Sequence, residues 1–161
     1  MSGKLYVVGT PIGNLGDISP RALETLESVD FIAAEDTRVT GKLLMCIGTK
    51  KPLISYHEHN KASSGERIVA RLLSGESCAL ITDAGMPAIS DPGEDLVRFC
   101  HERGVAVESV PGPSALITAL AISGIECNRF CFEGFLPADK KEKKDIFALY
   151  DDAEHEDAEN D

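Results

Sequence analysis

The stretch CALITDAGMPAISDPG, residues 78–93, places a short apolar run directly before a loop of glycine, proline and aspartate. An apolar run of this length between turn residues is typical of a strand that is buried on both faces of a parallel sheet. The loop after it concentrates residues with special backbone conformations: Gly85, Pro87, Pro92 and Gly93. The stretch therefore predicts a buried strand followed by a loop that approaches a ligand closely.

The same pattern recurs along the first 110 residues. Further apolar runs occupy residues 5–9, 30–35, 52–56 and 105–110, and helix-like segments separate them. Ser19 with Pro20 is a typical helix start, Thr37 is a candidate cap for the next helix, and Gly48 is a candidate helix stop. Strands that alternate with helices at this spacing predict an α/β domain with an open parallel sheet.

The pattern changes after the apolar segment that ends at Gly124. We expect an N-terminal α/β domain over residues 1–124 and the start of a second α/β domain over 125–145, with its first strand at 129–137. Residues 146–161 are strongly acidic and are expected to be disordered. The second domain is incomplete at this length, so the sequence suggests a chain that is truncated in its C-terminal domain.

Composition sets limits on function. The formal net charge is −11, but the last eleven residues hold seven acidic and no basic side chains, which leaves −4 for the first 150. The acidity therefore does not exclude a nucleic-acid partner. No apolar run is long enough to span a membrane and no signal peptide is visible, so we expect a cytoplasmic protein. The five cysteines form no CxxC pair and are expected to be reduced thiols.

Polar and glycine-rich loops follow all five predicted strands, where ligands bind in open parallel sheets. The first, GTPIGNLGD at residues 9–17, lacks the spacing of a dinucleotide or phosphate loop. A flat and largely neutral ligand such as an adenosine remains compatible with it, because glycines allow close approach. In the fourth loop, Asp91 with Pro92 is a candidate helix start, which leaves Asp83 and Gly85 unexplained.

Two other loops carry titratable side chains with more than one interpretation. Glu35 and Asp36 are suited to a general base or to binding ribose hydroxyls, with Arg38 on a phosphate, or to capping a helix. His57 and His59 are suited to a metal site that lacks a third ligand, or to a segment that contacts RNA. The residues alone do not choose among these roles.

Five motifs in order carry a resemblance: GTPIGNLGDIS, AEDTR, SYHEHN, DAGMPAISDPG and VPGPSA. Together they resemble the bacterial 16S rRNA (cytidine-2′-O)-methyltransferases of the tetrapyrrole methylase superfamily. The resemblance implies a two-domain α/β fold, a homodimer, and S-adenosyl-L-methionine held between the domains. The cofactor contacts that it implies are Ile12, Gly85, Met86, Ile89, Ser114, Ala115 and Leu136.

The implied reaction is S-adenosylmethionine-dependent methylation of a cytidine 2′-oxygen in 16S rRNA of the small ribosomal subunit. Glu35, Asp36 and His57 are the candidate catalytic groups, and Arg38 is the candidate RNA contact. No metal is expected. One alternative is an inactive N-terminal fragment that dimerises or binds a partner. Another is a metal-dependent hydrolase built on His57, Glu58 and His59.

Overall fold

The computed structural model describes residues 3–156, with side-chain surroundings up to residue 148. The chain divides into two compact units, Met1–Glu126 and Cys127–Asp161.

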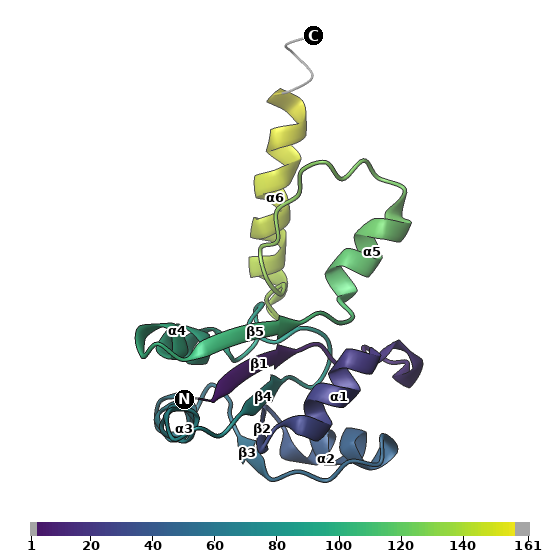
Figure 1. Cartoon of the computed structure of the whole chain (residues 1–161). Helices are drawn as coiled ribbons and strands as arrows, with labels where there is room; N and C mark the ends of the chain where they lie inside the picture. Colours follow the sequence, from purple (N-terminus) through teal and green to yellow (C-terminus); the bar gives the residue numbers. More distant parts are fainter. Residues whose placement is uncertain (1–2, 157–161) are drawn as a thin grey trace. The chain divides into compact units, whose positions relative to one another are not determined.

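The first unit is built on a five-stranded parallel sheet (Figure 1). The strands are β1 (Lys4–Val8), β2 (Phe31–Ala34), β3 (Leu53–Ser55), β4 (Cys78–Ile81) and β5 (Ala106–Val110), in the spatial order β3-β2-β4-β1-β5. The helices are η1 (Leu15–Asp17), α1 (Pro20–Ser28), α2 (Thr37–Cys46), α3 (Lys61–Leu73), α4 (Glu94–Glu102) and α5 (Ala115–Ser123). The predicted α/β fold with an open parallel sheet is confirmed.

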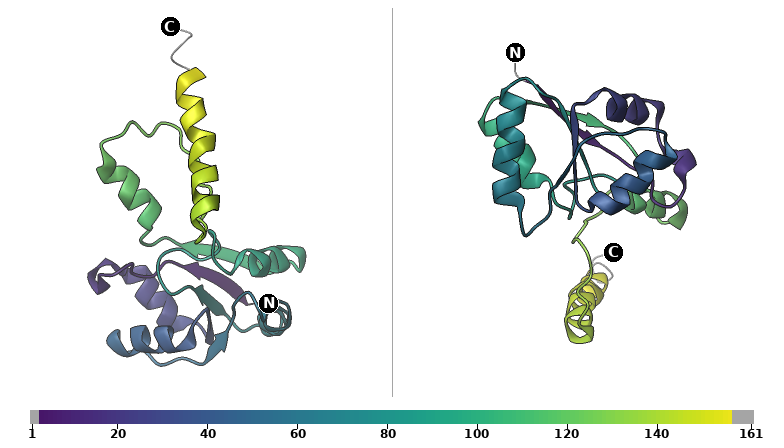
Figure 2. Two further views of the ribbon diagram at one scale, coloured as in Figure 1. Left: turned by 180° about the vertical axis from the view of Figure 1, so that it is seen from behind. Right: turned by 90° about the horizontal axis from the view of Figure 1, so that it is seen from below.

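Two layers of helices cover the sheet, as Figure 2 shows from below. One apolar cluster joins the sheet to α3 and α4 through Ile68, Leu72 and Leu96. A second cluster joins the opposite face to α1 and α2 through Leu26 and Leu44. Every residue of β2 and β4 is buried, which explains why these strands consist entirely of apolar side chains.

The helix starts test the local predictions. Ser19 caps α1, and its side chain accepts a hydrogen bond from the Ala22 backbone N–H at 3.0 Å, as expected. The prediction for α2 was wrong by one residue: Asp36 is the cap, and its carboxylate accepts from the Arg38 N–H at 2.8 Å. The helix start expected at Asp91 was also wrong, because α4 begins at Glu94 after a cap at Gly93.

The topology selects one crevice at the carboxyl edge of the sheet. Strands β1 and β4 are neighbours in the sheet, yet β1 leads into α1 on one face and β4 leads into α4 on the other. A pair of neighbouring strands whose connections diverge to opposite faces opens a crevice at their carboxyl ends, where open α/β sheets bind ligands. The topology therefore favours a ligand site at the loops after β1 and β4.

The last helix of the first unit differs from the others. Helix α5 is mostly apolar, with the sequence ALITALAIS, but none of its residues is buried. Gly124 ends it with φ +73°, a left-handed conformation that suits glycine.

The second unit corrects two expectations. The described residues 129–137 form no strand, although their sequence alternates in the manner of one. Helix α6 (Lys140–Glu156) extends well beyond residue 146, where we expected disorder to begin; residues 157–161 lie outside the described part. Asp139 explains the helix start, because its carboxylate accepts from the backbone N–H groups of Lys141 and Glu142 at 2.8 and 3.1 Å.

Within the part of the chain that the structure describes, none of the helices has both the length and the apolar character needed to cross a membrane.

Candidate functional site

The loops after β1 and β4 are joined by backbone hydrogen bonds. The Thr10 N–H donates to the Gly85 carbonyl at 2.9 Å, and the Gly85 N–H donates to the Thr10 carbonyl at 3.1 Å. Gly85 has φ +83°, a conformation that side chains rarely adopt. This short bridge fixes the two loops against each other at the mouth of the crevice.

The loop after β5 joins the same assembly through glycines. A Cβ on Gly9 would lie 2.5 Å from the Gly112 Cα and 2.7 Å from the Met86 Sδ. No real Cβ tolerates such distances, so glycine at position 9 allows the three loops to pack together. We expected the glycines of the first loop to make room for a ligand. At Gly9, the space next to the Cα is instead filled by Gly112 and Met86.

Most of the predicted cofactor contacts lie on these three loops. Ile12 and Gly85 are neighbours, since a Cβ on Gly85 would lie 3.5 Å from the Ile12 Cγ2 and from the Pro113 carbonyl oxygen. Ser114 caps α5 and accepts from the Ile117 N–H at 3.4 Å, and Ala115 is the first residue of that helix. Leu136 belongs to the second unit.

The segment around Ile89 has an unusual backbone. Ala88 and Ser90 adopt φ of +66° and +52°, in the left-handed region that residues with a Cβ rarely occupy. Ile89 between them leaves 59% of its side chain exposed. Backbone strain of this kind concentrates at ligand sites, where the surrounding structure maintains it. The segment is consistent with the predicted cofactor contact at Ile89.

Carboxylates from β2 and β4 gather beside the crevice. Glu35 accepts a hydrogen bond from the Thr82 hydroxyl at 3.0 Å, and the Asp83 carboxylate accepts from the Asp36 N–H at 3.3 Å. Asp83 is an exposed residue, but partial desolvation of its carboxyl group raises its pKa, and the carboxylates of Glu35 and Asp36 act in the same direction. Asp83 was not among the predicted catalytic residues, although its lack of any capping role in the sequence was a signal.

Asp36 has a different environment. Arg38 donates to its two carboxylate oxygens at 3.1 and 2.7 Å, and the pair caps the start of α2. These hydrogen bonds hold the pKa of the Asp36 carboxyl well below its usual range. A carboxylate held this firmly in its charged form is a weak proton acceptor. Of the two roles that the sequence left open for Asp36, the helix cap is the one that its contacts favour.

The exit of β3 is occupied by its own hydrogen bonds and ion pairs. Asn60 accepts from the His57 N–H at 2.9 Å and donates to the Ser55 carbonyl at 3.1 Å. Lys61 lies 2.7 Å from Glu58 and 2.9 Å from Asp95. These contacts tie the β3 exit to the starts of α3 and α4, and so give the segment a structural role.

The histidines of this segment lie near each other but lack further ligands. The rings of His57 and His59 have centroids 5.9 Å apart. Among the described residues, no three His, Cys, Asp or Glu side chains are arranged to hold a metal ion. The hydrolase alternative therefore gains no support from the arrangement of the side chains.

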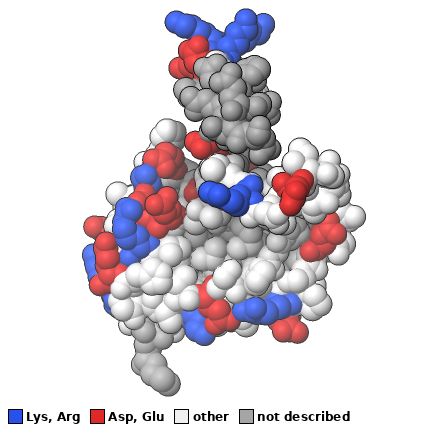
Figure 3. Space-filling view, turned by 90° about the horizontal axis from the view of Figure 1, so that it is seen from above, with Lys and Arg blue, Asp and Glu red and all other residues white. Residues whose placement is uncertain are grey.

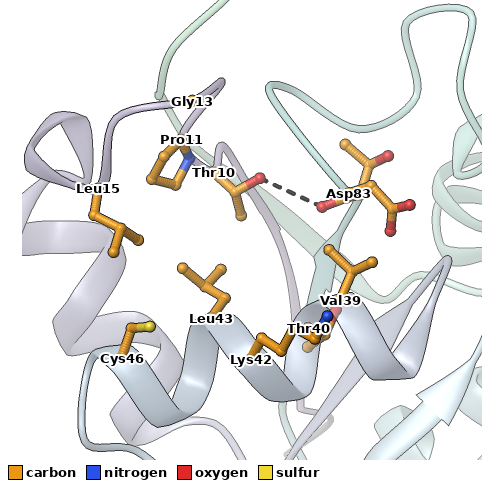
Figure 4. A pocket seen from close by; sticks show the side chains of 11 residues that line it. Thr10, Pro11, Gly13, Leu15, Val39, Thr40, Lys42, Leu43, Cys46 and Asp83 are labelled. Carbon is orange, nitrogen blue, oxygen red and sulfur yellow. Dashed lines mark hydrogen bonds between the residues drawn. The ribbon is translucent and has the colours of Figure 1, made fainter.

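A cavity of about 260 Å³ opens between the loop after β1 and helix α2 (Figure 4). Asp83 lies at one end and Leu15 and Cys46 lie at the other, with Thr10 between them. The Thr10 hydroxyl is turned to the Thr82 carbonyl at 3.3 Å. The residues that line the cavity are Thr10, Pro11, Gly13, Leu15, Val39, Thr40, Lys42, Leu43, Cys46, Thr82 and Asp83.

The surface charges form no large field of one sign on the face seen from above. Figure 3 shows basic and acidic side chains side by side there. Ion pairs among the described residues include the contacts of Glu108 with Lys4 at 2.7 Å and with Arg21 at 2.8 Å. Paired charges of this kind contribute little to attracting a polyanion.

Comparison with known proteins agrees with the fold. The family of tetrapyrrole (corrin/porphyrin) methylases matches residues 4–154. Uroporphyrin-III-C-methyltransferase from Thermus thermophilus superposes with a TM-score of 0.59 at 24% identity, over 79% of this chain and 54% of that one. A conserved hypothetical protein from Aeropyrum pernix gives a TM-score of 0.67 at 21% identity, over 81% of this chain and 46% of that one.

Closer relatives in sequence carry the name ribosomal RNA small subunit methyltransferase I. The protein of that name from Xylella fastidiosa is 56% identical over 143 residues, which cover 89% of this chain and 52% of the relative. The one from Escherichia coli is 53% identical over 143 residues, which cover 89% of this chain and 50% of the relative. The chain thus spans about half the length of these curated relatives. It belongs to the tetrapyrrole methylase family.

Proposed function

We propose that the chain carries the cofactor-binding unit of an S-adenosylmethionine-dependent rRNA methyltransferase that modifies a cytidine 2′-oxygen in 16S rRNA. The observation that supports this proposal most strongly is that the loops after β1, β4 and β5 converge at the crevice between β1 and β4. Membership of a methylase family and relatives above 50% identity that are named for small-subunit rRNA support this assignment.

The residues at the crevice fit the proposed cofactor. An adenosine with an amino acid attached needs apolar surface for its base and free backbone groups for its polar parts. Ile89 is exposed and Ile12 is partly exposed, so both offer apolar surface, and backbone groups of the loops after β4 and β5 would face the polar parts. When bound, S-adenosylmethionine would supply an electrophilic methyl group on its sulfonium.

The chain's own groups would orient the ribose and accept its proton. The sulfonium would give up its methyl group to the 2′-oxygen and keep the electron pair of the broken carbon–sulfur bond, while a carboxylate of the chain would accept the hydroxyl proton. Of the two aspartates, Asp83 suits this step better, because desolvation and neighbouring carboxylates raise its pKa whereas hydrogen bonds from Arg38 lower the pKa of Asp36. Glu35 and His57 remain in the proposal as positioning groups, and Arg38 as a phosphate contact.

The proposal extends to assembly and location. We expect a homodimer that acts on small ribosomal subunits in the cytoplasm. The exposed apolar side chains of α5, such as Ile117 and Ile122, are consistent with a partner surface. Sedimentation of the purified chain tests this part, since a monomer at all concentrations contradicts it.

Calorimetric titration with S-adenosylmethionine and S-adenosylhomocysteine tests the cofactor assignment. We expect both to bind, and we expect Ile12→Asp to abolish binding while Leu73→Asp, on the exposed side of α3, leaves it unchanged. Absence of binding at millimolar ligand would contradict the proposal. Transfer of labelled methyl groups to unmethylated small subunits then tests catalysis separately, and binding without transfer would support the non-catalytic alternative.

A further inference from the structure

The cavity between the loop after β1 and helix α2 is separate from the predicted cofactor contacts. None of the residues expected to touch the cofactor lines it, although Pro11 and Gly13 flank Ile12 and Asp83 lies two residues before Gly85. The two sites therefore share the loops after β1 and β4 but use different residues of them. A second ligand in this cavity would lie beside the cofactor.

The size of the cavity limits what it can hold. Sites for drug-sized ligands enclose roughly 300–1,000 Å³. At about 260 Å³ this cavity is slightly smaller, which suits a single nucleoside and is small for a nucleoside cofactor that also carries an amino acid.

The distribution of apolar and polar side chains around the cavity matches that of a nucleoside. Pro11 and Leu15 on one side and Val39 and Leu43 on the other provide apolar surfaces for the two faces of a flat base. Asp83 at one end provides a carboxylate, which accepts hydrogen bonds from ribose hydroxyls. The cavity thus has an apolar end for a base and an acidic end for a sugar.

Lys42 supplies charge complementarity with RNA. Lys42 lines the cavity and is exposed to solvent, and it forms no ion pair with the side chains that the structure describes. The neighbouring cation on α2, Arg38, is by contrast paired with Asp36. An unpaired ammonium beside an opening of this size suits the phosphate attached to a nucleoside.

We propose that this cavity receives a single unpaired RNA nucleoside, with its ribose at Asp83 and its base between Leu15 and Leu43. The inference rests on the proposed function and names its substrate site. A base inside a folded RNA must leave its stack before chemistry at its nucleotide, and a pocket that accepts the extruded nucleoside makes this possible. Asp83, at the ribose end of the cavity, lies two residues before Gly85, which is a predicted cofactor contact.

Cys46 provides a direct probe of occupancy. It lines the cavity and is exposed, whereas Cys78 and Cys100 are buried and Cys131 is an exposed thiol in the other unit. N-ethylmaleimide labelling of the full chain, followed by peptide mass spectrometry, measures each thiol separately. A bound nucleoside should shield Cys46, and Cys131 serves as the internal control.

Cytidine is the first ligand to test. At ten times its Kd it should slow the labelling of Cys46 by about tenfold and leave Cys131 unchanged. 2′-Deoxycytidine should protect more weakly, because it lacks the hydroxyl assigned to Asp83. Val39→Trp fills the cavity and should abolish protection, whereas Leu73→Trp, at an exposed helix position on α3, should retain it.

Three outcomes would overturn the inference. If millimolar cytidine leaves the labelling of Cys46 unchanged, the cavity does not bind a nucleoside. Equal protection of Cys46 and Cys131 shows a nonspecific effect. Protection by S-adenosylhomocysteine but not by cytidine assigns the cavity to the cofactor, and in that case the proposed function stands while the inference fails. The proposed function is tested separately: absence of S-adenosylmethionine binding in calorimetry would contradict it.

Discussion

The exits of β3 and β4 are both rich in polar residues, yet the structure uses them differently. At the β3 exit, Asn60 and Lys61 make local hydrogen bonds and ion pairs, although the Tyr56 hydroxyl and the His57 Nδ1 are buried there without a hydrogen-bond partner among the described residues. At the β4 exit, Asp83 is partly desolvated beside other carboxylates, and the backbone at Ala88 and Ser90 is strained. Polar composition alone therefore does not mark a ligand site; the β4 exit is distinguished by its strained backbone and its gathered carboxylates.

The tight packing of loops at the crevice gives the largest expected effect. In Gly112→Ala the new Cβ would lie 2.7 Å from the backbone of Gly9, so the two loops must separate. We expect the free energy of unfolding to fall by about 3 kcal/mol, measured by urea denaturation. Binding of S-adenosylhomocysteine should weaken as well, because the crevice is deformed.

Gly41→Ala is the matched control. Gly41 lies inside α2, and a Cβ there meets nothing within 4 Å. This variant should be more stable than the wild type by up to about 1 kcal/mol, since alanine is the better helix former. Equal losses in the two variants would show that the close approach at Gly112 has no special importance.

Removal of the Asn60 side chain at the β3 exit should change stability and leave the cofactor affinity unchanged. Asn60→Ala removes the hydrogen bonds to His57 and Ser55 and should lower the free energy of unfolding by about 1–2 kcal/mol. The affinity for S-adenosylhomocysteine, measured by calorimetry, should stay unchanged once folding is complete. A large loss of affinity with little loss of stability would make the β3 exit part of the binding site.

The pH dependence of stability should distinguish two aspartates that lie close together. The pKa of Asp83 is raised by folding, so its ionisation favours the unfolded chain as the pH rises above the ordinary value of about 3.9. The pKa of Asp36 is lowered, so its contribution to stability is present above that value and is lost as the pH falls through the folded pKa.

Two variants measure this difference. As the pH rises from 3 to 7, the free energy of unfolding of Asp83→Asn should increase relative to the wild type. That of Asp36→Asn should decrease relative to the wild type over the same range. Thermal unfolding at several pH values provides the comparison. The same sign for both variants would contradict the environments described for the two carboxyl groups.

The fold could be predicted because its signals are local. The apolar run Cys78–Ile81 is buried along its whole length, and Ser19 caps its helix as its position suggests. The convergence of the strand exits also follows from the parallel topology. Such features depend on patterns within a few residues and on general rules of chain connection.

The chemical environment of single groups could not be predicted in this way. The raised pKa of Asp83 depends on desolvation in the folded chain and on Glu35, which is far away in sequence and adjacent in space. The role of Gly9 depends on Gly112 and Met86, and residues 129–137 alternate like a strand without a described partner strand. These properties arise from tertiary contacts that no short motif contains.

A titration of the isotope-labelled chain with S-adenosylhomocysteine, followed by amide NMR, tests the central claim most directly. We predict shifts of the amide signals of Ile12, Gly85 and Ser114, while those of His57 and Asn60 stay in place. Shifts concentrated at the β3 exit, or no shifts at millimolar ligand, would contradict the assignment of the cofactor site to the crevice between β1 and β4.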